Sequence, residues 1–272
     1  MPLAPAEFDF VRRVVAERAG IVLSSTQGYL VESKLNSVVQ NSGLHSIEEL
    51  MIDLRRGAAS RLRERVAEAM TINETSFFRD IHPFEALRST VIPALIAARK
   101  SERKLSLGCA ASSSGQEPYT LAIVLAEYFP ELADWNVKIL ATDLSDEMLV
   151  RSREGIYTQF EVNRGLHARL LLKYFDRKGA DWQVREPLRK LVEFRKLNLT
   201  MPWPALPLFD FISIRNVLIY FDNASKQTIF EQIRSHIRTD GYLLLGGSET
   251  LLGLSVAFGR QEVDKSIFYR PT

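Results

Sequence analysis

Apolar and polar residues recur with the period of an α-helix over the first 70 residues. Phe8, Val11 and Val15 are spaced by three and four residues, and Gly20 follows at a position typical of a helix C-cap. Three further stripes of the same period consist of Leu30, Val31, Leu35, Val38 and Val39, of Leu50, Met51 and Leu54, and of Leu62, Val66 and Met70. The pattern predicts a small all-helical domain over residues 1–72.

Residues that begin or end helices separate these stripes. Ser24 or Ser25 can cap the second helix, and Gly43 can end it. Ser46, followed three residues later by Glu49, predicts a capping box at the start of the third helix.

From residue 105 short apolar runs replace the helical pattern. They read LSLGC, VKILATD, LVEFRKLN, FDFISI and GYLLLGG, and amphipathic stretches such as residues 119–129 and 226–237 lie between several of them. Because the runs are rich in Val, Ile and Leu without clean alternation, we expect strands buried on both faces, in a parallel sheet covered by helices. The charged stretch over about residues 156–190 fits this pattern poorly and predicts an inserted subdomain.

Composition narrows the class of protein. The 272 residues carry 35 Lys and Arg against 33 Asp and Glu, so the net charge of +2 does not favour binding to nucleic acid or to an anionic membrane. The single cysteine, Cys109, excludes an internal disulfide, and the first ten residues lack the pattern of a secretory signal. The apolar runs fall short of the ~18 residues of a membrane-spanning helix. The single cysteine and the absent signal pattern predict a cytoplasmic protein. With four scattered histidines and no cysteine pair, we expect no metal site.

A loop of small residues joins the first strand to the helix that follows it. Gly108 and Gly115 bracket this loop, and small residues let a ligand approach the backbone closely. Glu117, near the start of the helix, disfavours a phosphate ligand because the anion would meet a carboxylate. The spacing also differs from G-x-G-x-x-G and from the P-loop. A tight turn in which Glu117 only complements the helix dipole is the alternative.

An acidic residue, Asp143, ends the second strand. At this place in an α/β domain a carboxylate can accept hydrogen bonds from two ribose hydroxyls. The alternative is an N-cap for the helix that begins near Ser145. Together with a loop that does not favour phosphate, Asp143 indicates S-adenosylmethionine, which carries a ribose, an amino acid and a sulfonium but no phosphate.

Two further motifs are TINETSFFRD over residues 71–80 and FDFISIRNVLIYFD over residues 209–222. LGCAASSSGQEPY and ATDLSDEMLVRSREGIY lie between these two motifs in the chain. In their order along the chain, the four motifs resemble those of the S-adenosylmethionine-dependent methyltransferases of bacterial chemotaxis, the CheR family. The resemblance extends from GIVLSSTQGYLVESKL through GGSET. It implies an α/β, Rossmann-like methyltransferase domain over residues 91–272 with an inserted small antiparallel β-subdomain, preceded by a helical substrate-recognition domain and a cofactor-contacting linker over residues 73–90.

The resemblance also implies an activity and a set of site residues. Such enzymes methylate glutamate side chains in the cytoplasmic helical bundle of chemoreceptors, giving methyl esters and S-adenosylhomocysteine. Carried over by motif position, the cofactor-binding residues are Asn73, Thr75, Arg79, Gly108, Glu117, Asp143, Asn198, Leu199, Arg215 and Asn216, and the catalytic residues are Arg79 and Tyr220. Structural alternatives are Asn73 as a helix cap, Arg79 in a surface ion pair, Tyr220 as a core aromatic and Cys109 as a small buried filler.

Recognition of the receptor is less well specified. In better-known relatives the second N-terminal helix has a strongly basic face, whereas here it offers only Lys34. Residues 1–80 hold ten Lys and Arg against eleven Asp and Glu, and the basic cluster consists of Arg55, Arg56, Arg61, Arg63 and Arg65. Some members of the family bind a C-terminal pentapeptide of the receptor through the inserted subdomain, and they resemble one another in a longer, glycine-rich loop. Here the loop over residues 176–181 is short and has one glycine, so we expect no such binding.

Rival functions fit the sequence less well. The absent dinucleotide motif disfavours an oxidoreductase, and the charge balance disfavours a nucleic-acid methyltransferase. A non-catalytic S-adenosylmethionine-sensing or scaffold module of a chemosensory pathway is the remaining alternative. We expect a monomer that neither binds nucleic acid nor inserts into a membrane.

Overall fold

The computed structural model describes residues 3–56 and 60–272. Contacts within the chain divide it into two compact units. The first holds the described residues up to Ile72 together with Tyr220–Lys226, and the second holds Asn73–Ile219 and Gln227–Thr272.

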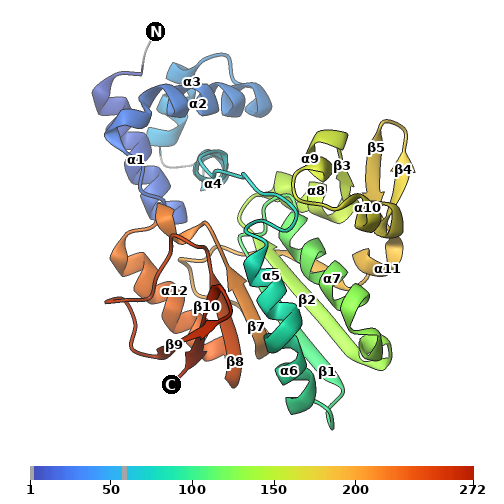
Figure 1. The fold of residues 1–272 in the computed structure, drawn as a ribbon. Coiled ribbons are helices and arrows are strands. Elements are labelled where there is room, and N and C mark those ends of the chain that lie inside the picture. The colour runs from blue at the N-terminus through green and yellow to red at the C-terminus, as the bar shows by residue number, and fades with distance from the viewer. Residues whose placement is uncertain (1–2, 57–59) are drawn as a thin grey trace. The chain divides into compact units, whose positions relative to one another are not determined.

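The first unit is helical, as the apolar stripes predict (Figure 1). Its main helices are α1 (Pro5–Ala19), α2 (Gly28–Ser42), α3 (Ile47–Arg55) and α4 (Ser60–Ala69). Val15, Leu35 and Leu50 are fully buried, which confirms the predicted core faces. Gly20 and Gly43 end α1 and α2 in the left-handed conformation, with φ of 68° and 71°, as expected of helix C-caps.

The two predicted serine caps differ from the expectation in detail. Ser24 caps the short 3-10 turn Ser25–Gln27, which comes directly before α2. Ser46 caps α3 by accepting a hydrogen bond from the backbone N–H of Glu49 at 3.2 Å. The Glu49 carboxylate, however, accepts from the N–H of His45 at 2.7 Å rather than from Ser46, so only half of the capping box forms.

The second unit is built on a seven-stranded sheet with the order β6-β2-β1-β7-β8-β10-β9. Its strands are β1 (Lys104–Ala110), β2 (Asn136–Asp143), β6 (Val192–Lys196), β7 (Phe209–Ile214), β8 (Ile237–Leu245), β9 (Phe258–Val263) and β10 (Ser266–Pro271). The five predicted strands pair in parallel, which confirms the α/β fold class.

The expectation of a purely parallel sheet is wrong at one edge. β9 and β10 form an antiparallel hairpin, and β10 also pairs with β8 in antiparallel fashion. The edge strand β9 has exposed or half-buried residues between its buried ends, Phe258 and Val263, because one face is solvated. A strand of this kind lacks the continuous apolar run that identifies the central strands.

Helices cover both faces of this sheet. They include α5 (His82–Ala86), α6 (Ile92–Ala98), α7 (Gln116–Tyr128), α8 (Asp146–Glu154) and α12 (Asn223–His236), and a π-helical turn, Leu87–Val91, joins α5 to α6. The connections β1-α7-β2 and β7-α12-β8 run in opposite directions from the centre of the sheet. Right-handed crossovers therefore place α7 and α12 on opposite faces. Figure 1 shows α6 and α7 in front of the strands.

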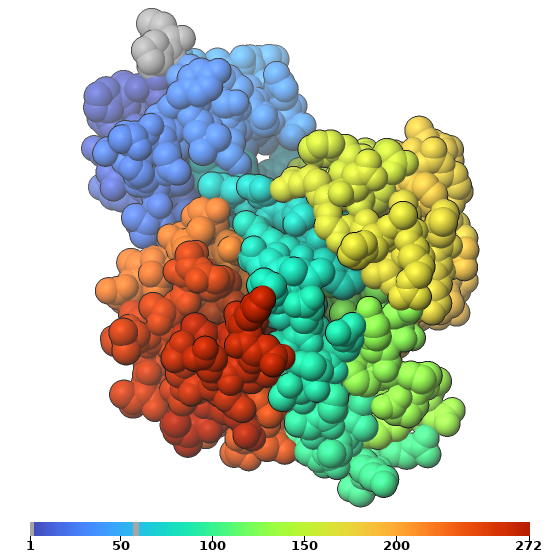
Figure 2. Space-filling model, in the orientation of Figure 1, coloured from blue at the N-terminus to red at the C-terminus, as the bar shows by residue number. Residues whose placement is uncertain are grey.

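The stretch over residues 156–190 forms the expected inserted subdomain. Three antiparallel strands have the order β3-β5-β4, with β3 (Ile156–Tyr157), β4 (Phe175–Lys178) and β5 (Asp181–Val184). The short helices α9 (Gln159–Asn163), α10 (Ala168–Tyr174) and α11 (Glu186–Arg189) accompany them. In Figure 2 the yellow atoms of this subdomain gather on one side of the second unit.

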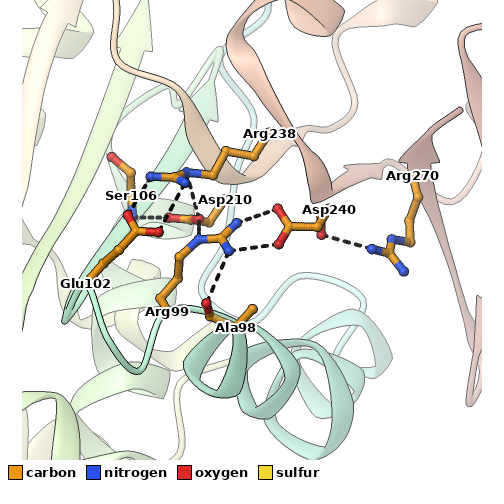
Figure 3. A network of polar contacts seen from close by, with 8 residues as sticks. All are labelled: Ala98, Arg99, Glu102, Ser106, Asp210, Arg238, Asp240 and Arg270. Carbon is orange, nitrogen blue, oxygen red and sulfur yellow. Dashed lines mark hydrogen bonds and ion pairs between the residues drawn. The ribbon is translucent and has the colours of Figure 1, made fainter.

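A network of charges, buried at Arg99 and Asp210, joins the end of α6 to the amino-terminal parts of β7 and β8 (Figure 3). The Asp210 carboxylate, 1% exposed, accepts from Arg99 Nε at 2.5 Å and from the N–H of Ser106 at 2.8 Å. Arg99 also pairs with Asp240, and this hydrogen bond is the main reason that the pKa of the Arg99 guanidinium is raised. The network lies toward the amino ends of the parallel strands, away from the edge at which ligands bind in such sheets.

Candidate active site

The candidate site lies where β1, β2 and β7 end. Residues 111–115 follow β1, Asp143 ends β2, and Arg215 and Asn216 follow β7. Because the three strands are parallel neighbours, their carboxyl ends meet at one edge of the sheet. The fold thus brings three of the predicted motifs together.

The small-residue loop after β1 is held by hydrogen bonds from three other elements. The N–H of Ser113 donates to the Asp143 carboxylate at 2.7 Å. Ser152 Oγ, on α8, donates to the carbonyl of Ser113 at 2.9 Å, and Tyr157 Oη, on β3, donates to the carbonyl of Ser114 at 2.7 Å. Burial raises the pKa of Tyr157, which keeps its hydroxyl protonated as a donor. The inserted subdomain therefore supports the loop.

The two glycines that bracket this loop differ. Gly115 has a φ of 94°, and a Cβ there would lie 3.0 Å from Tyr157 Oη and 3.1 Å from Ser152 Oγ, so this position requires glycine. Gly108 lies within β1 with no positive φ, and a Cβ there would meet Ile212 and Phe209 at ordinary contact distance. The structure gives no backbone reason for glycine at residue 108.

Asp143 is buried and accepts two backbone hydrogen bonds. One oxygen accepts from Ser113 and the other from the N–H of Ser145 at 2.9 Å. The N-cap of α8 is Ser145 itself, whose Oγ accepts from the N–H of Met148 at 3.3 Å. The alternative in which Asp143 caps this helix is therefore wrong.

Glu117 and Arg215 form the charged centre of the site. One oxygen of the Glu117 carboxylate accepts from Arg215 Nη1 at 2.8 Å, and the other accepts a short hydrogen bond from Ser213 Oγ. Arg215 Nη2 donates to the carbonyl of Arg79 at 2.9 Å and to the Asp80 carboxylate at 3.0 Å. The interactions of Glu117 thus extend beyond the helix dipole, and Arg215 ties residues 79 and 80 to the sheet.

The polar atoms of the site fit S-adenosylmethionine. Ser112 Oγ and Arg215 Nε are buried without a hydrogen-bond partner, as expected where a polar ligand supplies one. The carboxylates of Glu117 and Asp143 lie beside the loop. They suit a ligand with hydroxyl groups and a positive charge, and they oppose a phosphate.

The motif at the start of the second unit contacts the same loop. The carbonyl of Asn73 accepts from Ser113 Oγ at 2.7 Å, and residues 71–76 are irregular, so Asn73 is not a helix cap. Thr75 and Arg79 are partly buried. Arg79 Nη1 donates to the carbonyl of Glu74 at 3.1 Å, a main-chain contact in place of the surface ion pair considered above.

Asn198 and Leu199 lie in the segment after β6. The preceding residue, Leu197, donates its N–H to the carbonyl of Asp143 at 2.9 Å, which brings this segment to the end of β2. The Asn198 side chain accepts from the N–H of Thr200 at 3.1 Å, and Leu199 is buried. Both residues therefore directly follow the residue that contacts the end of β2, where the candidate ribose site lies.

Tyr220 is grouped differently. It belongs to the first unit, where its carbonyl accepts from the N–H of Val22 at 2.9 Å and where Ile21 and Phe221 form an isolated antiparallel bridge. Tyr220 is half-buried. Its contacts therefore group it with the first unit, although Ile219, directly before it in the chain, belongs to the second.

Backbone strain is concentrated at this site. Among the described residues, seven non-glycine residues have a positive φ, and five of them lie in the site segments: Phe78, Asp80, Ala111, Ser113 and Asn216. Each such conformation costs roughly 1–3 kcal/mol and persists only where the surroundings enforce it.

One residue of the site was missed from the sequence. Glu249, in the GGSET segment after β8, accepts hydrogen bonds from the backbone N–H groups of Asn216, Val217 and Leu218. The segment was part of the resemblance, but a carboxylate that binds only backbone has no local signal. These three partners lie more than 30 residues earlier in the chain.

Cys109 is buried, and burial, followed by the nearby charge of Glu117, raises the pKa of its thiol well above the usual value. Such a thiol is a poor nucleophile, which agrees with its interpretation as a buried filler. Within residues 3–56 and 60–272, no group of three His, Cys, Asp or Glu side chains is placed to hold a metal ion. No helix in the same ranges is long and apolar enough to span a membrane.

Comparison with known proteins agrees with the resemblance found in the motifs. Residues 73–267 match the profile described as "CheR methyltransferase, SAM binding domain", and residues 6–71 match that of the "CheR methyltransferase, all-alpha domain". The chain is 41% identical to chemotaxis protein methyltransferase 1 of Pseudomonas aeruginosa, with 99% of both chains covered. It is 39% identical to chemotaxis protein methyltransferase Cher2 of Pseudomonas putida, with 98% of this chain and 99% of that one covered. It is 36% identical to a chemotaxis protein methyltransferase of Vibrio parahaemolyticus, with 98% of each chain covered.

The matched profiles together cover nearly the whole chain and include an S-adenosylmethionine-binding domain. The expectations of fold class and cofactor are confirmed. This chain belongs to the CheR methyltransferase family.

Proposed function

We propose that this protein is a protein-glutamate O-methyltransferase that methylates glutamate side chains in the cytoplasmic helical domains of chemoreceptors. The observation that carries the proposal is the Glu117 and Arg215 pair beside Asp143, at the carboxyl edge of a sheet that belongs to an S-adenosylmethionine-binding family. The similarity to chemotaxis protein methyltransferases supports the same activity. Methylation of receptor cytoplasmic domains requires that the enzyme work in the cytoplasm.

The cofactor supplies a methyl group on a positively charged sulfonium, which is electrophilic without further activation. In our proposal Asp143 accepts hydrogen bonds from the ribose hydroxyls. Asn198 and Leu199 border the same end of the site, and Asn73, Thr75 and Gly108 line it. Glu117 provides negative charge near the amino-acid part, and Arg215 and Asn216 complete the opposite wall.

The substrate carboxylate needs orientation more than deprotonation. A glutamate side chain with a pKa near ~4.3 is already ionised at neutral pH, so the reaction requires no general base. The bond from sulfur to the methyl carbon breaks as the bond from that carbon to a carboxylate oxygen forms, and the positive and negative charges are both lost. Among the described residues, the Arg79 side chain donates to the carbonyl of Glu74 and forms no ion pair with a carboxylate. We propose that it orients the substrate carboxylate and that Tyr220 flanks the methyl group. Fixing the carboxylate in line with the bond from sulfur to the methyl carbon, and removing water from this anion, removes most of the entropic barrier.

Receptor recognition is proposed to depend little on a basic face of α2. Its single lysine, Lys34, donates from Nζ to the carbonyls of Ala69 at 2.7 Å and Thr71 at 2.8 Å, so it caps α4. Burial lowers the pKa of this ammonium group. The exposed residues of α2 are polar, aromatic or apolar, and none of them is charged: Tyr29, Leu30, Ser33, Asn36, Ser37, Gln40 and Asn41.

The arginine cluster of the first unit is also engaged within that unit. Arg63 donates to the carbonyl of Leu54 at 2.8 Å, and so caps α3. Arg65 donates to Ser42 Oγ at 3.1 Å, and Arg56 lies 3.7 Å from Asp53. These contacts support the interpretation of the cluster as a solvated face. We propose that the enzyme is a monomer and that its partner is the chemoreceptor cytoplasmic helical bundle. The enzyme would bind this bundle without a C-terminal pentapeptide tether.

The experiment that tests the function measures transfer of labelled methyl groups from S-adenosylmethionine to purified receptor cytoplasmic domains. We expect incorporation that alkali releases as methanol, the behaviour of a glutamate methyl ester. Binding of S-adenosylhomocysteine without incorporation into any chemoreceptor domain would instead favour the non-catalytic sensing module. Incorporation that resists alkali would contradict ester formation.

A further inference from the structure

The carboxylate of Glu249 binds four backbone N–H groups from two segments of the second unit. One oxygen accepts from Asn216 at 2.8 Å and from Gly246 at 2.7 Å. The other accepts from Val217 at 2.9 Å and from Leu218 at 2.7 Å. Within residues 3–56 and 60–272, the Glu249 carboxylate accepts hydrogen bonds from main-chain N–H groups alone.

These contacts hold a turn that would not form readily by itself. Asn216 has a φ of 57°, in the left-handed region, and the turn directs three successive N–H groups toward one point. Leu218 is buried, and Asn216 and Val217 are partly buried. Without an acceptor these N–H groups would be shielded from water and unsatisfied, which disfavours the turn. Glu249 supplies the acceptor for all three.

Gly246 provides independent support, because the clamp requires glycine there. A Cβ at residue 246 would lie 2.6 Å from Glu249 Oε2 and 2.8 Å from the backbone nitrogen of Asn216. Both distances are shorter than any normal contact of a Cβ atom. The segment after β8 can approach the turn after β7 only because residue 246 has no side chain.

The clamped turn is the one that carries the charged centre of the site. Arg215, which binds Glu117 and Asp80, comes directly before Asn216. The exit of the chain from β7 therefore fixes both the start of the Arg215 side chain and the orientation of Asn216. A displaced turn would move the guanidinium away from Glu117.

We infer that Glu249 is a positioning residue of the active site, which acts through Asn216 and Arg215 by holding their turn. The inference rests on the proposed function only in taking Arg215 and Asn216 as cofactor-site residues. It assigns no contact between Glu249 and the substrate or cofactor. Gly246 and Glu249 act as one unit in this role.

The test compares Glu249→Gln, Gly246→Ala and the double variant with the wild type. Glutamine at residue 249 keeps the volume of the side chain but has one oxygen acceptor instead of two. Its NH₂ group, a donor, would face two backbone N–H groups that then lose their acceptor. We expect each single variant to bind S-adenosylhomocysteine at least tenfold more weakly by calorimetry. The double variant is expected to bind S-adenosylhomocysteine no more weakly than the weaker-binding single variant, because both changes open the same clamp. Glu262→Gln, at a surface carboxylate that is 68% exposed, is the matched control and should bind as the wild type does.

The readout separates positioning from plain stability. Circular dichroism at the assay temperature selects conditions in which each variant is folded, and Glu249→Asp, a smaller change, serves if Glu249→Gln does not fold. Folded variants with wild-type affinity and wild-type kcat would overturn the inference, even if their melting temperatures were lower. Failure of the wild type to bind S-adenosylhomocysteine would instead overturn the proposed function. A wild type that binds but methylates no receptor leaves the binding test of Glu249 intact.

Discussion

The Glu117 carboxylate lies 2.8 Å from the Arg215 guanidinium, across 98 residues of sequence. Both side chains are largely buried, with 14% and 1% of their surfaces exposed. Because a buried charge without its partner is costly, neither residue can be removed without affecting the other. The pair thus couples the helix that follows β1 to the turn that follows β7, and with it the two halves of the proposed cofactor site.

We predict that Asp143→Ala weakens S-adenosylhomocysteine binding at least tenfold. The loss of a charge-assisted acceptor in a partly buried site costs about 1.5–3 kcal/mol, and the same carboxylate also holds the loop at Ser113. Calorimetry measures the affinity, with Asp146→Ala as a control because its side chain is 69% exposed in the first turn of α8. Unchanged affinity in a folded Asp143→Ala protein would exclude the ribose assignment.

We predict that Arg79→Ala and Tyr220→Phe lower kcat for receptor methylation more than they weaken cofactor binding. The proposed roles act on the reacting carboxylate and methyl group, so the lost interactions belong to the transition state. Steady-state methylation and calorimetry provide the two quantities, and Arg103→Ala, a substitution at an exposed side chain of the second unit, is the control. If both variants keep wild-type turnover, these roles are wrong.

We predict no saturable binding of a Trp-containing receptor tail peptide. The hairpin between β4 and β5 is closed by only Gly179 and Ala180, and Arg177 donates to the carbonyl of Ala180 at 3.3 Å while it stacks on Trp182 at 4.7 Å. A short loop that is occupied by its own contacts offers little room for an added strand. Calorimetric titration should give no saturable heat, and micromolar binding that is lost on changing residues 178–181 would contradict this.

We predict that Arg99→Met destabilises the fold by about 3–5 kcal/mol, because it leaves the buried Asp210 carboxylate with only the more distant Arg238, at 3.3 Å, as a cationic partner. Urea unfolding measures the change. Arg103→Met, at an arginine that is 54% exposed and 3.4 Å from Asp134, should cost less than about 1 kcal/mol. Since the network lies toward the amino ends of the strands, the folded Arg99→Met protein should bind S-adenosylhomocysteine normally. A much smaller loss of stability would show that the network contributes little.

We predict an acid-sensitive contribution to stability from Glu127. A hydrogen bond from Lys173, followed by one from Tyr174, lowers the pKa of this carboxyl to about 2. A lowered pKa stabilises the folded state above the unfolded value of ~4.3, and the gain disappears as the pH falls to about 2. Because Lys173 and Arg169 are 52% and 69% exposed, solvent screening limits the gain to about 1 kcal/mol.

Unfolding of Glu127→Gln at several pH values measures this contribution. The difference from wild type should be constant near neutral pH and should shrink between about pH 4.3 and pH 2. Glu262→Gln, at a surface carboxylate that is 68% exposed, is the control and should differ little from the wild type at every pH. A difference that does not change with pH would mean that Glu127 acts through packing alone.

The sequence alone was enough to predict the elements whose signals are local. Helices in the first unit follow from stripes with a period of 3.6, because a helix face is determined by residues three and four apart. The five central strands follow from apolar runs, because strands buried on both faces carry few polar positions. The four motifs identified the family, and with it the cofactor, and they led to the proposed site residues around Asp143 and Glu117.

The tertiary structure decided what depends on residues far apart in the chain. Local patterns cannot show that Ser145, and not Asp143, caps α8, that β9 and β10 turn back against β8, or that Tyr220 groups with the helical unit. The partners of Arg215 and the clamp by Glu249 are likewise absent from any local window, because a hydrogen bond depends on positions in space and not on spacing in sequence. The sequence therefore determined which residue types the site contains, and the folded chain determined which of them hold one another in place.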